Sequence, residues 1–343
     1  MTDPYDEYLR RAADLMEENR LVEAITELQE ASRLKPELAL AHIRLANILY
    51  VVDRREEALD EYRKAIKLDP DQPELELGHL RIGFALSESG QLEDAVREYR
   101  EAIRLNPDKP ELLLQLGWAL EKAGKLGEAI VVFREMVRAD PADPWTHHRL
   151  GLALRQSGHF EEAIAEHREA VQLDPSNPDW YLNLGGAYHD AGELNEAIAA
   201  YREAIRLDPT HFHAYYNLGE ALEDAQRKDE AMAAYRSAIA IPDEEIILEP
   251  SECIEYFGYF RELPHYRLGR LLKDKGQVEE ALSELRKAVE LDPENGEYCY
   301  ELGAALDEAG DTTGARELWA RVLTLNDEEA KVRAQRKLNQ AVP

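Results

Sequence analysis

The chain has 343 residues, of which 44% are hydrophobic, which is enough to form one or more folded cores. Asp and Glu outnumber Lys and Arg by 70 to 41, so the formal net charge is −29. A field of this sign repels the phosphates of a duplex and the headgroups of an anionic bilayer, so we expect neither nucleic acid nor a membrane surface to be the ligand.

The N-terminal stretch, MTDPYDEYLRR, lacks the basic start and the apolar centre of a signal peptide. No later apolar run approaches the roughly 20 residues that a membrane-spanning helix needs. The two cysteines, Cys253 and Cys299, are too few for a disulfide framework. We therefore expect a soluble, cytoplasmic protein, although so weak a cysteine signal leaves a periplasmic location open.

A proline closes a short segment such as LKP, LDP or LNP at nearly regular intervals along the chain. The first six of these prolines are Pro36, Pro70, Pro107, Pro141, Pro175 and Pro209. Four of the five intervals between them are 34 residues long. A period of this length is typical of stacked arrays, in which each repeat buries its apolar face against its neighbour.

Each repeat has the pattern of two amphipathic helices, here called helix A and helix B, because apolar residues recur at three- and four-residue steps. Between the two helices we expect a left-handed residue, a conformation that glycine adopts without penalty. Asn19, Asp53 and Gln226 occupy this position in three repeats, and Gln226 departs most from the pattern. Glycine holds it at Gly90, Gly124, Gly158, Gly192, Gly276 and Gly310.

An unbroken column of alanines on helix B predicts that helices A and B cross too closely for a larger side chain. The column comprises Ala24, Ala58, Ala95, Ala129, Ala163, Ala197, Ala231, Ala281 and Ala315. Leu-Gly pairs such as Leu218-Gly219 serve helix A in the same way, and aromatic residues such as Tyr235 fill the layer between the helices. No convincing strand pattern occurs, so we expect an all-α fold.

This pattern resembles the tetratricopeptide repeat family over nearly the whole chain. Segments such as AYYNLGEAL and EAIAAYREAIRLDP are especially similar to the long superhelical array of O-linked N-acetylglucosamine transferase, although no catalytic domain follows. The resemblance implies a right-handed superhelical solenoid of nine helix pairs. We expect seven repeats in residues 1–245, an insertion at 246–261, two repeats in 262–329, and a capping helix and tail at 330–343.

The insertion interrupts the regular spacing of the prolines. Pro242 and Pro293 are 51 residues apart, and the apolar and aromatic stretch IILEPSECIEYFGYFREL lies between them. It is too short to span a membrane. Two interpretations stay open: its aromatic residues pack on neighbouring repeats, or they bind a partner.

The resemblance also implies that helix A lines a concave ligand surface. The sixth position of helix A is arginine in five repeats, which is unexpected in so acidic a chain. Arginine and asparagine here can bind carboxylates and peptide carbonyls of an extended partner. Alternatively, each arginine pairs with an acid on an adjacent helix. The column reads Arg10, Arg44, Arg81, Gln115, Arg149, Asn183, Asn217, Arg267 and Glu301.

Asn183 and Asn217 match the asparagine ladder of the transferase array, whereas Arg44, Arg81, Gln115 and Arg149 depart from it and favour anionic ligands. Aromatic residues on the same surface are candidate anchors for a partner, although some can belong to the core between repeats. The aromatic set comprises Phe84, Trp118, Trp145, His148, Tyr216, Tyr266 and Tyr300, of which the first five are the candidate site residues. Later repeats place acids on this surface, so we expect an acidic end at Asp190, Glu220, Glu223, Asp224, Asp274, Glu297, Asp307 and Glu308.

Catalytic patterns are missing from the sequence: it contains no phosphate-binding glycine loop and no serine nucleophile elbow. A cluster of histidines lacks metal-ligand spacing; its members are His147, His148, His189, His211 and His213. We therefore expect no catalytic residue, no cofactor and no metal, and interpret the chain as a non-enzymatic scaffold or adaptor that binds a peptide or helix of a partner, with acidic or carboxyl-terminal groups. Two alternatives are an assembly factor for a multi-subunit complex and a regulatory subunit of a separately encoded enzyme. Self-association is also left open.

Overall fold

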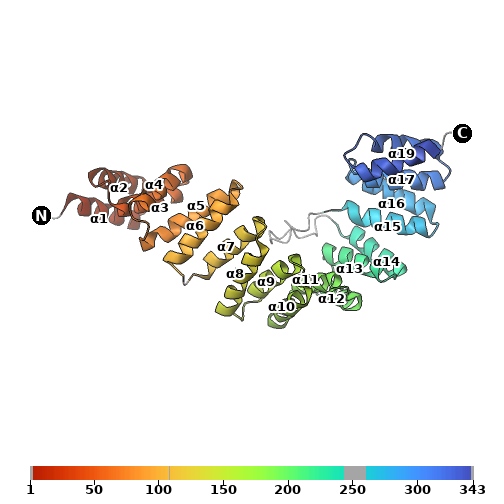
Figure 1. The fold of residues 1–343 in the computed structure, drawn as a ribbon, viewed down its shortest axis with the longest axis horizontal. Helices are drawn as coiled ribbons and strands as arrows, with labels where there is room; N and C mark the ends of the chain where they lie inside the picture. The colour runs from red at the N-terminus through yellow and green to blue at the C-terminus, as the bar shows by residue number, and fades with distance from the viewer. Residues whose placement is uncertain (1–2, 108, 243–259, 341–343) are drawn as a thin grey trace. The chain divides into compact units, whose positions relative to one another are not determined.

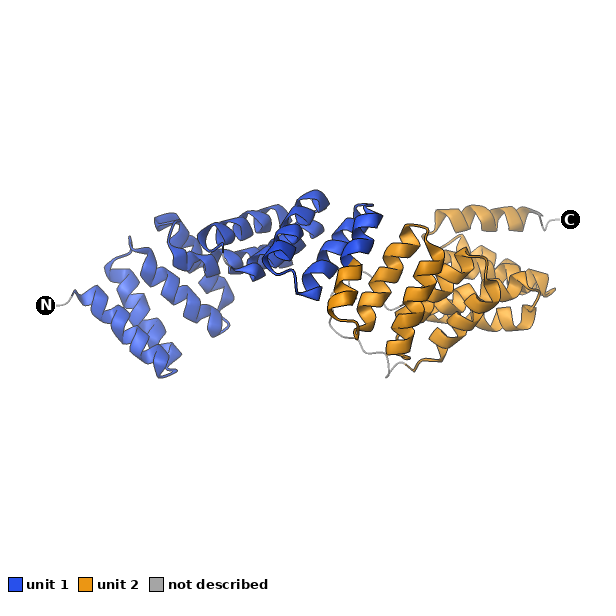
Figure 2. Cartoon of the chain, turned by 90° about the horizontal axis from the view of Figure 1, so that it is seen from below, with its two compact units in different colours: residues 1–166 blue, residues 167–343 orange. Residues whose placement is uncertain are grey.

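The computed structural model describes residues 3–107, 109–242 and 260–340 (Figure 1). Regular secondary structure within these ranges is entirely helical, which confirms the predicted all-α class. The chain divides into two compact units, residues 1–166 (unit 1) and residues 167–343 (unit 2), shown in separate colours in Figure 2. We describe each unit by itself.

Unit 1 consists of consecutive helices of 13 or 14 residues. They are α1 (Pro4–Glu17), α2 (Leu21–Leu34), α3 (Ala39–Val51), α4 (Arg55–Leu68), α5 (Glu76–Glu88), α6 (Leu92–Leu105), α7 (Pro110–Lys122), α8 (Leu126–Ala139), α9 (Pro144–Gln156) and the first part of α10 (Phe160–Leu173). Helix α1 packs on α2, α3 on α4, α5 on α6 and α7 on α8, as expected for repeated helix pairs.

Unit 2 continues the same scheme. Its further helices are α11 (Pro178–Asp190), α12 (Leu194–Leu207), α13 (Phe212–Asp224), α14 (Lys228–Ala240), α15 (Glu262–Asp274), α16 (Val278–Leu291), α17 (Gly296–Glu308), α18 (Thr312–Val322) and α19 (Glu328–Gln340). Helix α11 packs on α12, α13 on α14, α15 on α16 and α17 on α18. The fold is therefore an all-α solenoid of helix pairs, while its right-handed winding and the number of nine repeats stay predictions.

The turn between the helices of each pair adopts the expected left-handed conformation. Gly192 has φ 78°, and the non-glycine residues Asn19, Asp53 and Gln226 have φ 57°, 61° and 61°. Asn tolerates this region comparatively well, whereas Gln has no such advantage. The prediction that Gln226 occupies the glycine position is confirmed. Its backbone adopts the same left-handed conformation as the glycines, which costs free energy for a residue with a side chain.

Burial within each pair follows the predicted columns. Every alanine of the helix B column has an exposed fraction of 0%. The glycine of helix A receives the aromatic ring of helix B: a Cβ added at Gly219 would lie 2.3 Å from the ring of Tyr235, and one added at Gly117 would lie 2.3 Å from the ring of Phe133. Small residues thus allow a close crossing that larger ones would prevent.

Buried histidines form a second column that the sequence reading missed. Helix A histidines contact a glutamate 19 residues later on helix B, with the nitrogen Nδ1 2.5 to 2.7 Å from the carboxylate. The pairs are His42–Glu61, His79–Glu98, His147–Glu166 and His265–Glu284. Four further repeats replace both partners, with Leu113–Val132, Tyr181–Ala200, Tyr215–Ala234 and Cys299–Leu318, while Tyr8 keeps Glu27. Because histidine and glutamate are present together or replaced together in these repeats, the sequence contained a signal that the two side chains are in contact.

Two irregular segments separate regular repeats. The three extra residues PEL form a single 3-10 turn, η1 (Pro73–Leu75), whose Leu75 is fully buried. The expected insertion at residues 246–261 lies outside the described residues except for Phe260 and Arg261. Helix α15 nevertheless packs on α14, and Arg261 donates hydrogen bonds to the carbonyl oxygens of Ala238 and Ile241. The stacking of unit 2 therefore continues across this point.

Helix α19 covers the end of unit 2. It begins at Glu328, two residues before the expected boundary, and packs on α17 and α18. Ala330 and Ala334 are fully buried, and Leu338 packs beside them, as the sequence pattern predicts for a capping helix. No helix among the described ranges is long and apolar enough to cross a membrane.

Candidate functional site

The predicted site residues all lie on the first helix of a pair. In unit 1 they are Arg44 on α3, Arg81 and Phe84 on α5, Gln115 and Trp118 on α7, and Trp145, His148 and Arg149 on α9. In unit 2 they are Asn183 on α11 and Tyr216 and Asn217 on α13. A side chain that is already hydrogen-bonded or ion-paired within the protein is less available to a partner, so we first describe the internal contacts of each candidate.

Arg149 is bound internally. It is the sixth residue of its helix, and its Nη2 donates to Oε2 of Glu121, the twelfth residue of α7, at 2.6 Å. Both side chains are only 8% exposed, and the guanidinium also lies 5.4 Å from the ring centroid of Trp118. Arg149 therefore matches the alternative interpretation, in which a column arginine pairs with an acid on an adjacent helix.

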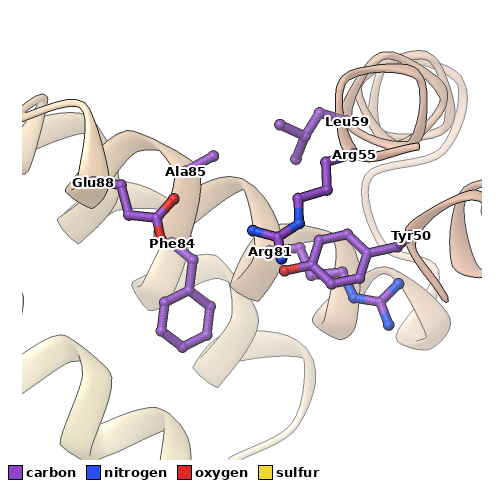
Figure 3. A pocket seen from close by; sticks show the side chains of 7 residues that line it. All are labelled: Tyr50, Arg55, Leu59, Arg81, Phe84, Ala85 and Glu88. Atoms are coloured by element: carbon purple, nitrogen blue, oxygen red, sulfur yellow. The ribbon is translucent and has the colours of Figure 1, made fainter. Parts of the chain in front are cut away.

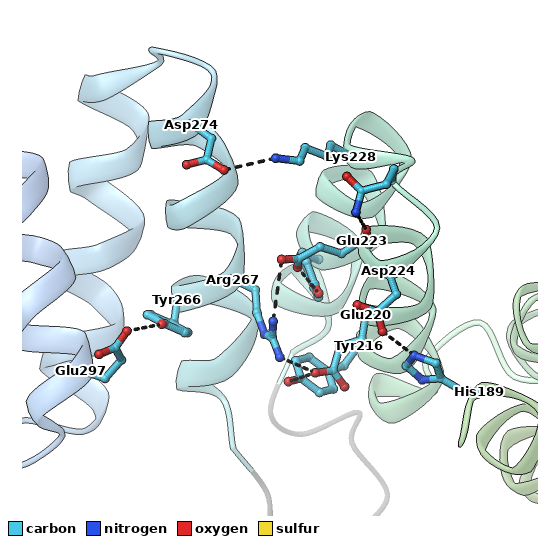
Figure 4. A network of polar contacts seen from close by, with 12 residues as sticks. His189, Tyr216, Glu220, Glu223, Asp224, Lys228, Tyr266, Arg267, Asp274 and Glu297 are labelled. Carbon is cyan, nitrogen blue, oxygen red and sulfur yellow. Dashed lines mark hydrogen bonds and ion pairs between the residues drawn. The ribbon is translucent and has the colours of Figure 1, made fainter. Parts of the chain in front are cut away.

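Unit 2 repeats this relation between the sixth and twelfth positions. Arg267 on α15 lies 2.7 Å from Glu220 and 3.7 Å from Glu223, the twelfth residue of α13 (Figure 4). On α17 the charges are exchanged, because Glu301 accepts from Lys273, the twelfth residue of α15, at 2.5 Å. A charge at the sixth position is thus neutralised by the preceding helix A in three places.

Arg81 breaks this rule. The twelfth residue of α3 is Tyr50, and the guanidinium of Arg81 lies 4.0 Å from the centroid of its ring. Nη1 of Arg81 donates to the hydroxyl of Tyr62 and to Oδ1 of Asn47 at 3.3 Å. Burial raises the pKa of Tyr62 to about 12, so that hydroxyl is neutral at physiological pH. Among the described residues, no carboxylate pairs with Arg81.

Arg44 lacks an acid for the same reason. The equivalent residue on α1 is Met16, whose uncharged side chain cannot form an ion pair with Arg44. Arg44 is half-buried on α3 and makes no hydrogen bond or ion pair with any described residue. By contrast, the exposed Arg10 pairs with Asp14 on its own helix at 3.0 Å. Arg44 and Arg81 are therefore the column arginines whose counter-charge is missing from the described chain.

An open pocket lies beside Arg81, with a cavity volume of about 230 Å³ (Figure 3). Its floor includes Phe84, which is 37% exposed and meets Tyr99 edge-on at 5.9 Å. Arg55 also reaches the pocket but pairs with Asp53 at 2.9 Å. The lining residues are Tyr50, Arg55, Leu59, Arg81, Phe84, Ala85 and Glu88. The pocket thus combines an aromatic surface with the unneutralised guanidinium.

The aromatic candidates farther along unit 1 differ in accessibility. Trp145 is 42% exposed, and its ring lies 5.2 Å from that of the fully buried His148. Trp118 is half-buried, and its Nε1 is enclosed with no hydrogen-bond partner in the described ranges. Gln115 is half-buried one turn earlier on α7. Trp145 is therefore the accessible aromatic residue of this group, and its ring packs against the buried ring of His148.

The candidates of unit 2 are largely engaged within the protein. Asn183 is 2% exposed, and its amide donates to the carbonyl of Asp179 in its own helix at 2.7 Å. The hydroxyl of Tyr216 donates to Glu220 at 2.9 Å. Asn217 is half-buried, and its side chain makes no hydrogen bond with a described residue. An asparagine ladder in unit 2 stays a prediction, and Asn217 is its more accessible member.

The acids predicted for the late surface are mostly neutralised. Besides Glu220 and Glu223 with Arg267, the pairs are Asp224 with His189 at 2.8 Å, Asp274 with Lys228 at 3.2 Å, Glu297 with Arg333 at 2.6 Å, and Asp307 with Lys337 at 3.8 Å. Figure 4 shows part of this network. The acidic character expected from the sequence is therefore weaker than the residue types suggest, because Lys and Arg side chains accompany the carboxylates other than Asp224, whose partner is an imidazole.

The histidines of the predicted cluster also have separate partners. His147 contacts Glu166, and His211 contacts Asp179 at 3.1 Å. Burial lowers the pKa of His213 to about 4, so this side chain is neutral at physiological pH. No group of three His, Cys, Asp or Glu side chains in the described ranges is arranged to hold a metal ion.

The repeated helix pairs, the left-handed turns and the buried alanine column define an α-solenoid repeat protein. Tetratricopeptide repeat models match residues 39–72, 80–144, 151–192, 185–226, 212–244 and 269–310, which together cover more than half of the chain. The chain belongs to the tetratricopeptide repeat family, as the resemblance in the sequence predicted.

Several solved structures are similar in part. YrrB, described as a tetratricopeptide repeat protein with an unusual peptide-binding site, is 24% identical over 55% of this chain and 95% of its own, with a TM-score of 0.48. MamA from Desulfovibrio magneticus RS-1 is 24% identical over 48% and 94%, with a TM-score of 0.45. Yeast Tom70 is 15% identical over 98% and 95%, with a TM-score of 0.49. No curated protein matches this chain in sequence. Family membership therefore rests on the repeat models.

Proposed function

We propose that this protein is a non-enzymatic interaction scaffold that binds a peptide or helix of a partner protein on the helix A surface. The proposal includes seven repeats in residues 1–245, an insertion at 246–261, two repeats in 262–329 and a terminal cap. Within it, Arg44 and Arg81 bind acidic or carboxyl-terminal groups of the partner. Phe84 and Trp145 anchor its apolar side chains, and Gln115 binds its backbone. In unit 2, taken by itself, Asn217 is the candidate for a backbone contact.

The missing counter-charge of Arg81 is the observation that carries this proposal. Where a column arginine has a structural role, in Arg149 and Arg267, the preceding helix A supplies glutamate at the twelfth position. At Arg81 the same position is Tyr50, which stacks on the guanidinium and leaves its charge uncompensated. A half-buried guanidinium binds a carboxylate more strongly than an exposed one, because less water competes. An anionic group of a partner fits this place.

The remaining candidates support this surface without contacting the partner. Arg149 is bonded to Glu121 and lies against Trp118, and the buried His148 packs against Trp145, so these residues fix the shape of α7 and α9. Asn183 and Tyr216 are bonded within unit 2 and have the same supporting role. Binding energy in such interfaces concentrates on a few accessible anchors, which here are Arg81, Phe84 and Trp145.

The test introduces at Arg81 the pairing seen elsewhere in this chain, between an arginine at the sixth position and a glutamate at the twelfth position of the preceding helix A. Tyr50→Glu places at α3 the acid that Glu121 and Glu223 provide elsewhere, so Arg81 becomes internally paired. Partners captured from an extract of the source cells on the full-length protein are identified by mass spectrometry, and their affinity for each variant is measured by calorimetry. We expect Tyr50→Glu to weaken the partner at least tenfold, as Arg81→Ala does.

The matched control is Tyr50→Phe, which keeps the aromatic ring over Arg81 and removes only the hydroxyl. It should bind like the original protein, and circular dichroism should show that all variants are equally helical. If the captured partner binds equally well to Tyr50→Glu, Arg81→Ala and the original protein, the proposed surface is wrong.

A further inference from the structure

We infer that the pocket beside Arg81 selects a peptide with two opposite charges: an acidic group over Arg81, a basic group at Glu88, and an apolar side chain between them. This inference rests on the proposed function and adds the direction and charge pattern of the bound segment. It assigns a binding role to Glu88, a residue that the sequence reading did not single out.

The three contact residues lie on one face of α5. Arg81, Phe84 and Glu88 follow one another at steps of three and four residues, the spacing that brings side chains onto one side of a helix. Figure 3 shows Arg81 beside Tyr50 and Glu88 at the far side of the pocket, with Phe84 and Ala85 between them. Seven residues of helix separate the two charges by about 10 Å along the axis.

Glu88 has the property that distinguishes Arg81, because it also lacks a counter-charge. Its side chain is exposed at the end of α5 and makes no hydrogen bond or ion pair with a described residue. The other acids around the pocket differ, since Asp53 is paired with Arg55 at 2.9 Å. The pocket therefore presents one uncompensated positive and one uncompensated negative group, each at its own end.

The negative end also restricts the acidic group of the ligand. A phosphate carries a charge close to −2, and the uncompensated carboxylate of Glu88 would repel it more strongly than a singly charged group. A carboxylate carries a single charge and matches the planar guanidinium of Arg81. The geometry thus favours an Asp, Glu or carboxyl-terminal group over a phosphorylated residue.

The middle of the pocket is apolar. Phe84 is 37% exposed, and Leu59 and Ala85 complete the lining beside it. An aliphatic or aromatic side chain placed here would cover Phe84 and remove both surfaces from water. An extended, polyproline-like peptide advances about 9 Å in three residues and returns to the same side, so an acid and a base three residues apart span the two ends.

The experiment selects peptides from a displayed library of random twelve-residue sequences on the full-length protein. The original protein should enrich peptides with an acid and a base three residues apart and an apolar residue between them. Glu88→Lys should exchange the basic residue for an acidic one and keep the first acid. Glu88→Gln should lose the preference for the base without gaining an acid. Tyr50→Glu should lose the preference for the first acid.

Synthetic peptides from the selection then give the size of the effect. Reversing the basic residue should weaken binding to the original protein about three- to fivefold, because the pair with Glu88 is solvent-exposed, and should strengthen binding to Glu88→Lys. Thermal unfolding checks that each variant is folded.

The outcomes separate the two proposals. If Glu88→Lys and Glu88→Gln select the same peptides as the original protein while Tyr50→Glu loses the acid, the role of Glu88 is wrong and the Arg81 site stands. If Tyr50→Glu also selects the same peptides, both proposals fail. Enrichment of peptides without any acidic residue on the original protein would likewise overturn both.

Discussion

At the scale of single residues, the histidine–glutamate pairs show how one nitrogen of each buried imidazole receives a polar partner. His79 is 4% exposed, and its Nδ1 lies 2.7 Å from Glu98. The equivalent repeat at Leu113 and Val132 has no polar group at either position. Glu98 gives Nδ1 of His79 a partner, whereas the buried Nε2 of His79 has none among the described residues. Removing the glutamate alone would leave both ring nitrogens unpaired, whereas an apolar pair at both positions buries no polar group.

Glu98→Val should therefore destabilise unit 1 by about 1–3 kcal/mol, because the imidazole of His79 loses its partner inside the protein. The double variant His79→Leu with Glu98→Val copies Leu113 and Val132 and should recover most of that loss. Urea unfolding followed by circular dichroism measures both free energies. A double variant as unstable as the single one would show that the pair contributes through something other than satisfied polarity.

Gln226 is a residue whose backbone conformation should lower the stability of the protein measurably. Its φ of 61° lies in the left-handed region, which a non-glycine residue enters at a cost of about 1 kcal/mol, and the hydrogen bond from its side-chain amide to the carbonyl oxygen of Glu223 is long, at 3.4 Å. Gln226→Gly should raise the unfolding free energy of unit 2 by about this amount. The control Ala233→Gly changes an exposed residue within α14 and should lower it by about 1 kcal/mol. Equal effects of the two variants would contradict the backbone explanation.

At the scale of helices, the close crossing of each pair depends on residues without side-chain bulk. Gly219 on α13 faces Tyr235 on α14, which is fully buried and cannot move aside without disturbing its neighbours. The crossing therefore tolerates no added methyl group at this point. The same reasoning applies where Gly117 meets Phe133.

Gly219→Ala should cost about 1–3 kcal/mol, because the new Cβ would lie 2.3 Å from the Tyr235 ring. Gly127→Ala is the matched control: nothing lies within 4 Å of an added Cβ, and the residue is within α8, so this change should be neutral or stabilising. Differential scanning calorimetry can compare the two. Comparable unfolding temperatures would show that the helices separate easily.

The cap provides a pH-dependent contact between helices. Arg333 on α19 donates to Glu301 on α17 at 2.7 Å, and Lys273 donates at 2.5 Å. Burial raises the pKa of Glu301, but the hydrogen bonds from Lys273 and Arg333 outweigh it, so the net pKa is lowered below the ordinary 4.5. A lowered carboxyl pKa contributes stability above the unfolded pKa, and this stability is lost as the pH falls through the folded value.

Glu301→Gln should therefore be less stable than the original protein by about 1–2 kcal/mol at neutral pH, and the difference should shrink as the pH falls below about 4.5. The neutral amide resembles the protonated carboxyl, which explains the convergence. Urea titrations of both proteins across this pH range test it. A difference that stays constant with pH would mean that Glu301 is not ionised in the folded protein at neutral pH.

At the scale of the whole molecule, the net charge of −29 predicts that the protein does not bind duplex nucleic acid. Duplex DNA should not bind at physiological salt, because no phosphate would be neutralised to release counterions. A gel shift with a basic DNA-binding protein as positive control tests this. Submicromolar binding that weakens steeply with added salt would contradict it.

The sequence by itself determined the repeat, the helix pairs, the left-handed turns and the buried alanine column. These features depend on residues close together in the chain, where helical periodicity and the conformational freedom of glycine act directly. Even Gln226 could be placed, because the surrounding pattern is regular. The family followed from the same columns.

Only the tertiary structure decided which candidate arginines are available. Arg149 and Arg81 occupy the same column, but Glu121, 28 residues before Arg149, neutralises one, whereas Tyr50 stacks on the other. That difference depends on which side chain of the preceding helix A faces each guanidinium, and helix periodicity within one repeat does not contain this information. The availability of a charge is a property of the packed array, because its counter-charge comes from a neighbouring repeat.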